Sequence, residues 1–391
     1  MRVLFLSHCV PNPPDKGEKI RAHHVVMELA RHFEVHLVAF ARGPGDLEAA
    51  RALESRCASV RVAVLSSRWA LLRAGLQFAA GKSLMMSYYG GAALHAQVAE
   101  AVRSAPPDVT VAFSGAMAQY APEGTPLVLD MTDVDSEKWL DYGKLRFGGP
   151  LYRMEGRRLR EQEIRYANRA HCTFLATDAE RALLSGIVPS ADVRAFENGV
   201  ALDYFDPARV LAEHRGRPYL AFVGVMDYFP NVDGVCWFAR EVMPDVRRNS
   251  DLQEFVVVGR NPAPAVRRLH GADGVTVTGS VADVRPYLAG ASAVVAPLRL
   301  ARGIQNKVLE ALAMNKVVFA SREVCRTFGE RVPAGVVACG SANEFAAAIA
   351  RWRNEPETAL DIRGAAAGRF RWDRQVDKLA EAIRSASGWR Q

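Results

Sequence analysis

The chain has 391 residues, of which 49% are hydrophobic and 24% charged, and its formal net charge is +7. This length predicts two or three domains, and no run of about eighteen apolar residues is present, so we expect no transmembrane helix. The positive charge permits binding to anionic lipid, nucleic acid or phosphorylated substrates. Because no helix-turn-helix, zinc-finger or RNA-recognition signature is found, we do not expect a nucleic-acid partner.

The first residues and the cysteines indicate a cytoplasmic protein. The opening Met-Arg-Val-Leu-Phe-Leu-Ser-His has too short an apolar run for a signal peptide. The six cysteines are scattered, without a Cys-x-x-Cys pair or a Cys/His cluster at zinc spacing. We therefore expect reduced thiols and no structural metal.

The first half of the chain alternates short apolar segments with helical segments. Residues 2–7 are expected to form a strand, followed by a Pro-rich loop and a helix over about 19–32. Further strands are expected at 35–40, 60–65, 109–113, 127–130, 172–176 and 193–196, with helices at 46–56, 92–103 and 178–185. This alternation predicts an α/β domain in which helices cover a parallel sheet.

The second half repeats this organisation after a linker. An Asn-Gly turn signal at 198–199 precedes residues 206–218, which are rich in Pro, Arg and Gly. Strands are then expected at 219–223, 254–258, 275–278, 293–297, 317–320 and 336–338. The sequence predicts two doubly wound, Rossmann-like domains, at 1–205 and 219–371, with a helical tail over 372–391.

Residues 293–321 form one strand, loop, helix and strand unit. We expect Gly303 to open the helix, so that its free N–H groups favour an anion at the strand end. Lys307 and Glu310 are neighbours on the helix surface, and a cation beside a carboxylate suits a phosphate next to a ribose diol. A surface ion pair is the alternative interpretation.

The run Arg-Gly-Ile-Gln-Asn-Lys-Val-Leu-Glu-Ala-Leu-Ala resembles the nucleotide-sugar signature of retaining GT-B glycosyltransferases of family 4. The resemblance implies two domains facing across a cleft, with the tail packing back on the first. By position it gives Lys307 the donor diphosphate and Glu310 the ribose. The family's first motif glutamate is replaced by Arg302, so backbone amides of Gly303, Ile304 and Gln305 are left to serve the sugar and diphosphate.

Three further segments carry the resemblance over nearly the whole chain. They are Ser-His-Cys-Val-Pro-Asn-Pro-Pro-Asp-Lys-Gly-Glu-Lys-Ile-Arg, Asp-Val-Asp-Ser-Glu-Lys-Trp and Gly-Val-Met-Asp-Tyr-Phe-Pro-Asn-Val-Asp. Together they are most similar to the exopolysaccharide sugar transferases associated with exosortase (PEP-CTERM) systems.

The donor site is expected to draw on four more turns. Gly17 and Arg21 lie in the first loop, which the resemblance places over the donor; a plain strand-to-helix connection is the alternative. Gly224 follows the second domain's first strand, where the family's cations are replaced by Val225 and Asn231. Arg260 or Arg302 is expected to compensate for these cations, and backbone atoms near Val281 are expected to read the base. Besides residues 302–310, the candidate donor-binding residues are therefore Gly17, Arg21, Gly224, Arg260 and Val281.

Asp133 and Asp135 follow a strand of the first domain. As strand-end carboxylates they are expected to contact acceptor hydroxyls or to balance charge, and capping of a helix by Asp133, Asp135 or Ser136 is the structural alternative. The basic stretches 68–78 and 153–169 are consistent with contact to an anionic membrane, but also with buried amphipathic helices.

The sequence thus predicts a metal-independent, retaining hexosyltransferase without a cofactor. It would move a sugar from a UDP- or GDP-linked donor to a hydroxyl of a glycan or lipid-linked acceptor, at the cytoplasmic face of the plasma membrane, in cell-surface glycan synthesis. Two alternatives stay open. One is a nucleotide-sugar epimerase of the same fold, and the other is a non-catalytic glycan-binding partner subunit.

Overall fold

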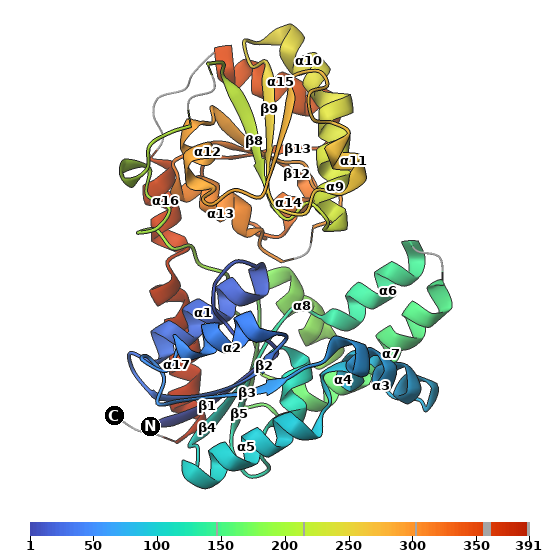
Figure 1. The fold of residues 1–391 in the computed structure, drawn as a ribbon, viewed down its shortest axis with the longest axis vertical. Helices are drawn as coiled ribbons and strands as arrows, with labels where there is room; N and C mark the ends of the chain where they lie inside the picture. The colour runs from blue at the N-terminus through green and yellow to red at the C-terminus, as the bar shows by residue number, and fades with distance from the viewer. Residues whose placement is uncertain (146–147, 214–215, 302, 355–360, 389–391) are drawn as a thin grey trace. The chain divides into compact units, whose positions relative to one another are not determined.

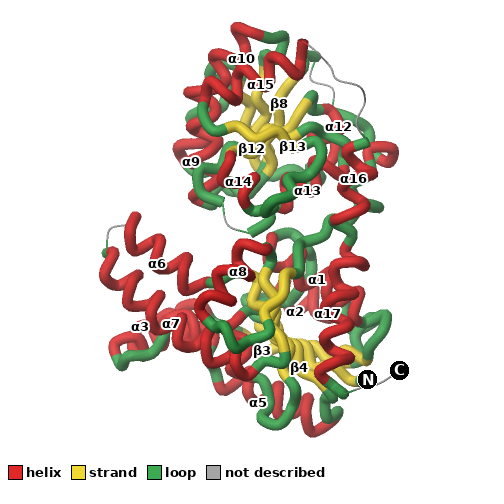
Figure 2. Tube along the Cα trace, turned by 180° about the vertical axis from the view of Figure 1, so that it is seen from behind, coloured by secondary structure: helices red, strands yellow, loops and turns green. Residues whose placement is uncertain are grey.

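The computed structural model describes residues 1–145, 148–213, 216–301, 303–354 and 361–388, and these residues divide into two units. The first unit comprises Met1–Glu197 and Trp372–Gln391, and the second comprises Asn198–Arg371. Each is a parallel sheet with helices on both faces, drawn as yellow strands among red helices in Figure 2. None of the helices in the described ranges combines the length and apolar character that a membrane crossing requires.

The first unit contains a seven-stranded parallel sheet in the order β3-β2-β1-β4-β5-β6-β7. Its strands are β1 (Arg2–Ser7), β2 (Glu34–Ala41), β3 (Ser59–Val64), β4 (Val109–Phe113), β5 (Leu127–Thr132), β6 (Cys172–Leu175) and β7 (Val193–Ala195). Its helices are α1 (Gly17–Leu29), α2 (Pro44–Arg51), α3 (Ser67–Ala79), α4 (Leu84–Tyr89), α5 (Ala92–Ser104), the 3₁₀ helix η1 (Gly115–Tyr120), α6 (Asp135–Leu145), α7 (Gly149–Arg169), α8 (Asp178–Ile187) and α17 (Trp372–Ala386).

The alternation of side chains along β1 shows why the sheet is buried on both faces. Val3 and Phe5 join one apolar core, which also contains residues of α1 and α17, whereas Leu4 and Leu6 join a second core on the other face. Successive side chains of a strand point to opposite faces, so a strand buried on both sides is apolar throughout. Helix α17 packs against α1 over the first of these cores (Figure 1).

The second unit contains a six-stranded parallel sheet in the order β10-β9-β8-β11-β12-β13. Its strands are β8 (Tyr219–Val223), β9 (Glu254–Val258), β10 (Val275–Gly279), β11 (Ala293–Ala296), β12 (Val318–Ser321) and β13 (Val336–Cys339). Its helices are η2 (Pro207–Arg209), α9 (Phe229–Trp237), the π-helical turn η3 (Phe238–Val242), α10 (Met243–Asn249), α11 (Pro264–Arg267), α12 (Arg285–Gly290), α13 (Asn306–Ala313), α14 (Arg322–Arg326), α15 (Ala342–Asn354) and α16 (Ile362–Arg369).

The boundary between the units differs from the expected one. The first unit ends at Glu197 rather than at 205, and residues that were expected to form a linker belong to the second unit. The Val200 amide donates to Phe370 O (2.7 Å), and the Glu213 amide donates to Pro286 O (2.9 Å). These hydrogen bonds attach the connection to the second unit, which the Pro, Arg and Gly content of the segment does not reveal.

Candidate functional site

The loop between β11 and α13 carries the predicted anion site. Helix α13 begins at Asn306 rather than at Gly303, because Gly303 has φ = +63° and forms the turn before the helix. Glycine adopts this left-handed conformation without the penalty that a Cβ imposes. Val308, Leu309 and Leu312 are buried on one side of α13, and Lys307 and Glu310 are half-buried on another. The first N–H groups of the helix have no partner within it, so this end attracts negative charge.

Lys307 is held in place by a residue of another helix. Its Nζ donates to Asn231 Oδ1 (2.6 Å) and lies 4.4 Å from the centre of the Phe222 ring. Asn231 is buried at 5% exposure, and its Nδ2 donates to Val225 O (2.8 Å). The amide therefore has a fixed orientation, and the cation has a fixed position above the end of β8. Sequence reasoning treated Asn231 only as a lost cation and missed this contact.

The pKa values of Lys307 and Glu310 are both shifted in the direction that favours the uncharged form. Burial lowers the pKa of Lys307 to about 7, and the neighbouring Glu310 carboxylate partly opposes this shift. Burial also raises the pKa of Glu310 to about 7, opposed by Lys307. A diphosphate next to Lys307 would favour the charged amine, since an opposite charge at close range raises the pKa of a lysine.

Two glycines bring the backbone of neighbouring strand ends together. A Cβ on Gly224 would lie 2.8 Å from Asn231 Nδ2, so glycine leaves the space that the asparagine amide occupies. Gly259 has φ = +153°, and a Cβ there would lie 1.7 Å from Gly224 O. Neither position accepts a side chain without displacing the backbone or the amide that holds Lys307.

The strand order gathers most of the predicted donor residues at one edge of the second sheet. The strands β10, β9, β8 and β11 are neighbours in the sheet. The segments that follow them carry, in this order, Val281, Arg260, Gly224 and Lys307. Parallel strands end at the same edge, where α/β sheets bind ligands. The Met226 amide donates to Arg260 O (2.9 Å), which ties the turns after β8 and β9 to each other.

The remaining residues of the motif have different environments. Ile304 is buried at 5% exposure, and Gln305 Nε2 donates to Gly303 O (3.2 Å). Asn198 Nδ2 donates to Asn306 Oδ1 (2.9 Å) at the start of α13. Arg302 lies outside the described residues, so its expected contact with the donor stays a prediction.

Gly17 and Arg21 lie in the first unit, and only one of them is at the surface. Gly17 is exposed at the first position of α1. Arg21 is buried at 1% exposure; its Nε and Nη2 donate to Asp130 (2.9 and 2.8 Å), and its Nη1 donates to Phe196 O (2.8 Å). These contacts place the guanidinium inside the first unit, so its expected role at the donor stays a prediction.

Asp133 and Asp135 share a cation at the end of β5. Lys138 Nζ lies 2.9 Å from Asp135 Oδ1 and 3.4 Å from Asp133 Oδ2, while Asp133 Oδ1 is buried without a hydrogen-bond partner among the described residues. Burial opposes protonation of Lys138, but the two carboxylates outweigh it and raise the pKa of the lysine. Lys138 of α6 thus balances one of the two negative charges, and the group keeps a net charge of −1.

Carboxylates from two other helices fix this loop. Glu180 of α8 accepts from the Val134 amide (2.8 Å), and Glu163 of α7 accepts from the Ser136 amide (3.0 Å) and from the Ser136 hydroxyl. Burial raises the pKa of Glu163 to about 7 despite these bonds. The amide at the start of α6 is therefore capped from a neighbouring helix.

One group in the described residues has side chains suited to a metal ion. Ligand atoms of His8, Cys9 and Glu18 lie within 4.8 Å of one another at the end of β1. Burial opposes charging of His8, but Cys9 and Glu18 raise its pKa well above the usual value. Arg42 lies 3.8 Å from Glu18 Oε1, and this fixed positive charge disfavours a second cation. The imidazole is better described as the partner of Glu18. The hydrogen bond from His8 is the main cause that lowers the pKa of Glu18 to about 2.

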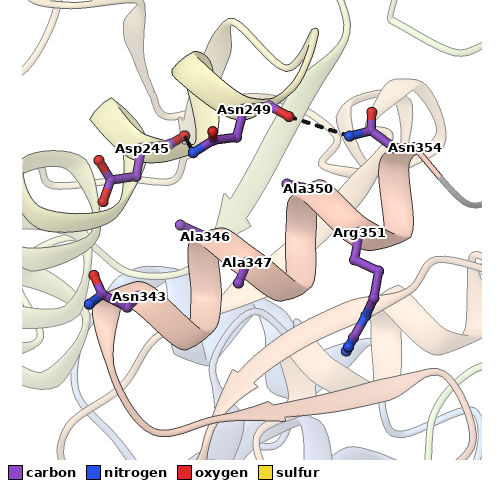
Figure 3. Close-up of a pocket in the computed structure, with 8 residues that line it drawn as sticks. All are labelled: Asp245, Asn249, Asn343, Ala346, Ala347, Ala350, Arg351 and Asn354. Carbon is purple, nitrogen blue, oxygen red and sulfur yellow. Dashed lines mark hydrogen bonds between the residues drawn. The ribbon is translucent and has the colours of Figure 1, made fainter.

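A cavity of about 500 Å³ in the second unit lies away from the motif residues. Figure 3 shows its lining between α10 and α15, where Asn354 Nδ2 donates to Asn249 O (3.4 Å). The other lining residues are Asp245, Asn343, Ala346, Ala347, Ala350 and Arg351. None of the predicted donor residues contributes to it, and Asp245 already pairs with Arg248, so this lining does not indicate a ligand.

Comparisons with known proteins agree with this architecture. Residues 217–355 match the family model described as "Glycosyl transferases group 1", and this match lies within the second unit. Sucrose-phosphate synthase of Thermosynechococcus elongatus superposes with a TM-score of 0.70 at 16% identity, covering 98% of this chain and 99% of that chain. HepE of Anabaena, in complex with UDP, superposes with a TM-score of 0.66 at 14% identity, covering 98% and 100%. The chain has the GT-B fold.

The GT-B fold confirms the predicted fold class, two Rossmann-like domains in one chain. A glycosyltransferase from Rickettsia africae also superposes, with a TM-score of 0.63, 12% identity and 98% coverage of both chains. No curated protein matches the chain in a sequence search. At these identities the structures share a fold with this chain, and its assignment to family 4 or to exopolysaccharide synthesis stays a prediction.

Proposed function

We propose that this GT-B protein is a retaining glycosyltransferase that uses a nucleotide diphosphate sugar, with UDP or GDP as the nucleotide. The observation that carries the proposal is Lys307, which Asn231 holds at the start of α13 inside the segment that matches glycosyl transferases group 1. A desolvated, positioned amine at the amino-terminal end of a helix is suited to a diphosphate leaving group. UDP and UDP-glucose complexes of Anabaena HepE support the choice of ligand.

The chemistry follows from the charge that develops as the bond to the sugar breaks. The departing diphosphate gains negative charge, which Lys307 and the first amides of α13 stabilise. Glu310, three residues further along the same helix, accepts from the ribose hydroxyls. Fixed groups of this kind are effective because they need not reorganise during the reaction. Retention at the anomeric carbon and a metal-independent reaction are implied by the family resemblance.

The acceptor is a hydroxyl of a glycan or a lipid-linked sugar. Asp133 and Asp135, at a strand end of the first unit, are the residues proposed to contact it. Arg260 and Arg302 are proposed to assist Lys307, in place of the cations that the family has near Val225 and Asn231. We propose a cytoplasmic protein in cell-surface glycan synthesis, and its contact with the membrane depends on a separate surface, helix α3.

The test is calorimetric titration with UDP, GDP, ADP and dTDP. We expect one nucleotide to bind saturably, and Lys307→Ala and Glu310→Ala to weaken it by about 10- to 100-fold, since a charge-assisted contact contributes about 1.5–3 kcal/mol. Arg326→Ala is the matched control, because this cation of the same unit is exposed and pairs only with Glu323 among the described residues. Equal binding by all variants would place the nucleotide elsewhere, and absence of binding to folded protein would favour the non-catalytic partner subunit.

A second measurement separates transfer from epimerisation. The substitution of Arg302 for the family's first glutamate is the feature that favours an epimerase. Incubation with the nucleotide sugar that binds, with and without a glycan acceptor, distinguishes the two by product. A transferase releases nucleoside diphosphate only when the acceptor is present. An epimerase needs no acceptor: it yields the epimeric nucleotide sugar or, where water cleaves the bond to the sugar, the altered free sugar together with nucleoside diphosphate.

A further inference from the structure

Helix α3 of the first unit presents its apolar side chains to solvent. Trp69, Leu71, Leu72 and Leu76 are 72%, 59%, 54% and 66% exposed. Trp69, Leu72 and Leu76 are spaced three and four residues apart and so form one stripe along the helix. Isolated exposed leucines are ordinary on a protein surface, but four large apolar side chains on one 13-residue helix form a patch.

The inward side of α3 is small and polar, which reverses the usual arrangement. Ala70 and Ala74 are the buried residues of the helix. Arg73 turns toward the protein, where its Nε donates to Ser87 O (3.1 Å) and its Nη2 donates to Tyr88 O (3.0 Å). An amphipathic helix of a globular domain normally buries its large apolar face. Here the polar contacts fix α3 on α4 with the apolar stripe outward.

The position of α3 leaves this stripe uncovered within the first unit. Figures 1 and 2 both show α3 at the outside of that unit, beside α7. Contact with α7 is made near the end of α3, where Arg158 stacks on the Phe78 ring at 4.5 Å and donates to Phe78 O (2.6 Å). The side chains of the stripe take no part in this contact.

The α3 segment itself carries charges of one sign, and the carboxylates close to it come from α7: Glu155 accepts from the Leu84 amide, and Glu161 lines a pocket together with Lys82. The chain has no Asp or Glu between Glu54 and Glu100, a segment that contains Arg68 and Lys82 at either end of α3. Both side chains are exposed, and neither makes an ion pair with a carboxylate in the described part of the chain. Such a surface attracts anionic lipid headgroups, at about 1 kcal/mol for each basic residue near the membrane.

The dimensions of the stripe favour a membrane over a second copy of the chain. Thirteen residues make a helix about 20 Å long and about 10 Å wide, which offers roughly 200 Å². A stable protein interface buries about 800 Å² on each partner. The helix is also shorter than the roughly 30 Å hydrocarbon core of a bilayer, so it would lie in the plane of the surface.

We propose that α3 is a membrane-docking helix that inserts Trp69, Leu72 and Leu76 among the lipids of an anionic bilayer, with Arg68 and Lys82 at the headgroups. This inference is independent of the donor site in the second unit. It assigns the membrane contact that the sequence predicts to one surface and one orientation.

Vesicle co-sedimentation of the full chain tests the proposal. We expect binding to vesicles of phosphatidylcholine with about 30% phosphatidylglycerol, weaker binding to phosphatidylcholine alone, and a decline with added salt. The double variant Leu72→Glu with Leu76→Glu should bind at least about tenfold more weakly, because each substitution removes an apolar side chain that the bilayer would bury. The control Leu211→Glu, at a leucine of the second unit that is 91% exposed, should bind as the original chain does.

Two further measurements separate the outcomes. The fluorescence of Trp69, obtained as the difference from Trp69→Phe because the chain has six tryptophans, should shift to the blue on vesicles and be quenched by brominated lipid. Nucleotide binding should be unchanged in the Leu72/Leu76 variant, so a failed donor site would not mimic failed docking. Equal vesicle binding by original and variant chains, or dimerisation without vesicles that the variant abolishes, would overturn the proposal; the second result would give the surface to another copy.

Discussion

The strand ends of the two units carry charged side chains in opposite states. In the second unit, Lys307 is held by a neutral amide, and burial lowers its pKa to about 7. In the first unit, Lys138 lies between Asp133 and Asp135, which raise its pKa although burial opposes this. One cation lacks a full counter-charge, and the other already has two.

An anionic ligand gains most at the strand end of the second unit. A diphosphate at Lys307 supplies the charge that the site lacks, so binding and protonation support each other. An anion at Lys138 would compete with two fixed carboxylates. The aspartates are therefore better suited to neutral hydroxyls, such as those of an acceptor, than to the donor phosphates.

The greatest loss of stability is expected from a substitution that breaks the buried ion pair of the first unit. Asp130→Ala removes the carboxylate that accepts from Nε and Nη2 of the Arg21 guanidinium, which is 1% exposed. We expect a loss of about 3–5 kcal/mol in the stability of this unit, since removal of one partner strands a buried charge. Hydrogen exchange of the β1 and β5 amides in the full chain measures the unit separately.

Arg31→Ala is the control for Asp130→Ala. Arg31 is exposed and pairs with Glu28, so its removal should cost less than about 1 kcal/mol. The structural interpretation of Arg21 fails if Asp130→Ala leaves exchange unchanged but removes nucleotide binding, because Arg21 would then serve the donor as the sequence predicts.

A smaller effect is expected at the residue that positions Lys307. Asn231→Ala removes the acceptor at 2.6 Å from Nζ, and we expect about a tenfold loss of nucleotide affinity, which corresponds to one hydrogen bond to a charged group. Titration calorimetry measures it, with Asn343→Ala, an exposed amide beside the Figure 3 cavity, as control. Unchanged affinity in Asn231→Ala would show that Lys307 needs no support or binds no phosphate.

These two predictions also show what the sequence could and could not reveal. The strands were predictable because buried parallel strands are continuous apolar runs, as in β8 and β11, where every residue is buried. The neighbouring positions of Lys307 and Glu310 on α13 were predictable from their spacing, and their role at a donor stays a prediction. Asn231 was not, because its contact with Lys307 joins residues 76 apart in the chain, and the burial of Arg21 depends on Asp130, 109 residues away.

Helix α3 marks the same limit. Its pattern of leucines and arginines allowed either a membrane surface or a buried amphipathic helix. Hydropathy gives the period of the stripe but not its direction, which depends on Arg73 reaching the carbonyls of Ser87 and Tyr88. The outward stripe is a property of the packed unit.

The pH dependence of nucleotide binding is the next, smaller effect. Lys307 must be charged in the complex, and its pKa in the free protein is about 7. Affinity should therefore be highest near pH 7. It should fall above this pH by up to about tenfold per pH unit as Lys307 loses its proton, and fall less steeply below it as Glu310, whose pKa is also about 7, becomes protonated beside the ribose. In Glu310→Gln the fall should begin at lower pH, because Glu310 is the group that opposes the lowering of the Lys307 pKa. Calorimetry between about pH 6 and pH 9 measures the onset, and a flat profile in both proteins would exclude Lys307 as the titrating contact.

The smallest effect is expected at the aspartates of the first unit. Asp135→Asn removes one of two carboxylates beside Lys138, and Asp133 still faces the ammonium at 3.4 Å. We expect nucleotide affinity to stay within about twofold, because Asp133 and Asp135 outnumber Lys138 in charge and the site therefore does not attract a diphosphate. Measured at saturating donor, a fall in acceptor-dependent turnover with unchanged nucleotide affinity would place Asp135 at the acceptor. A tenfold loss of nucleotide affinity in the folded variant would instead show that the first unit contributes charge to the donor, and the contrast between the two strand ends would no longer hold.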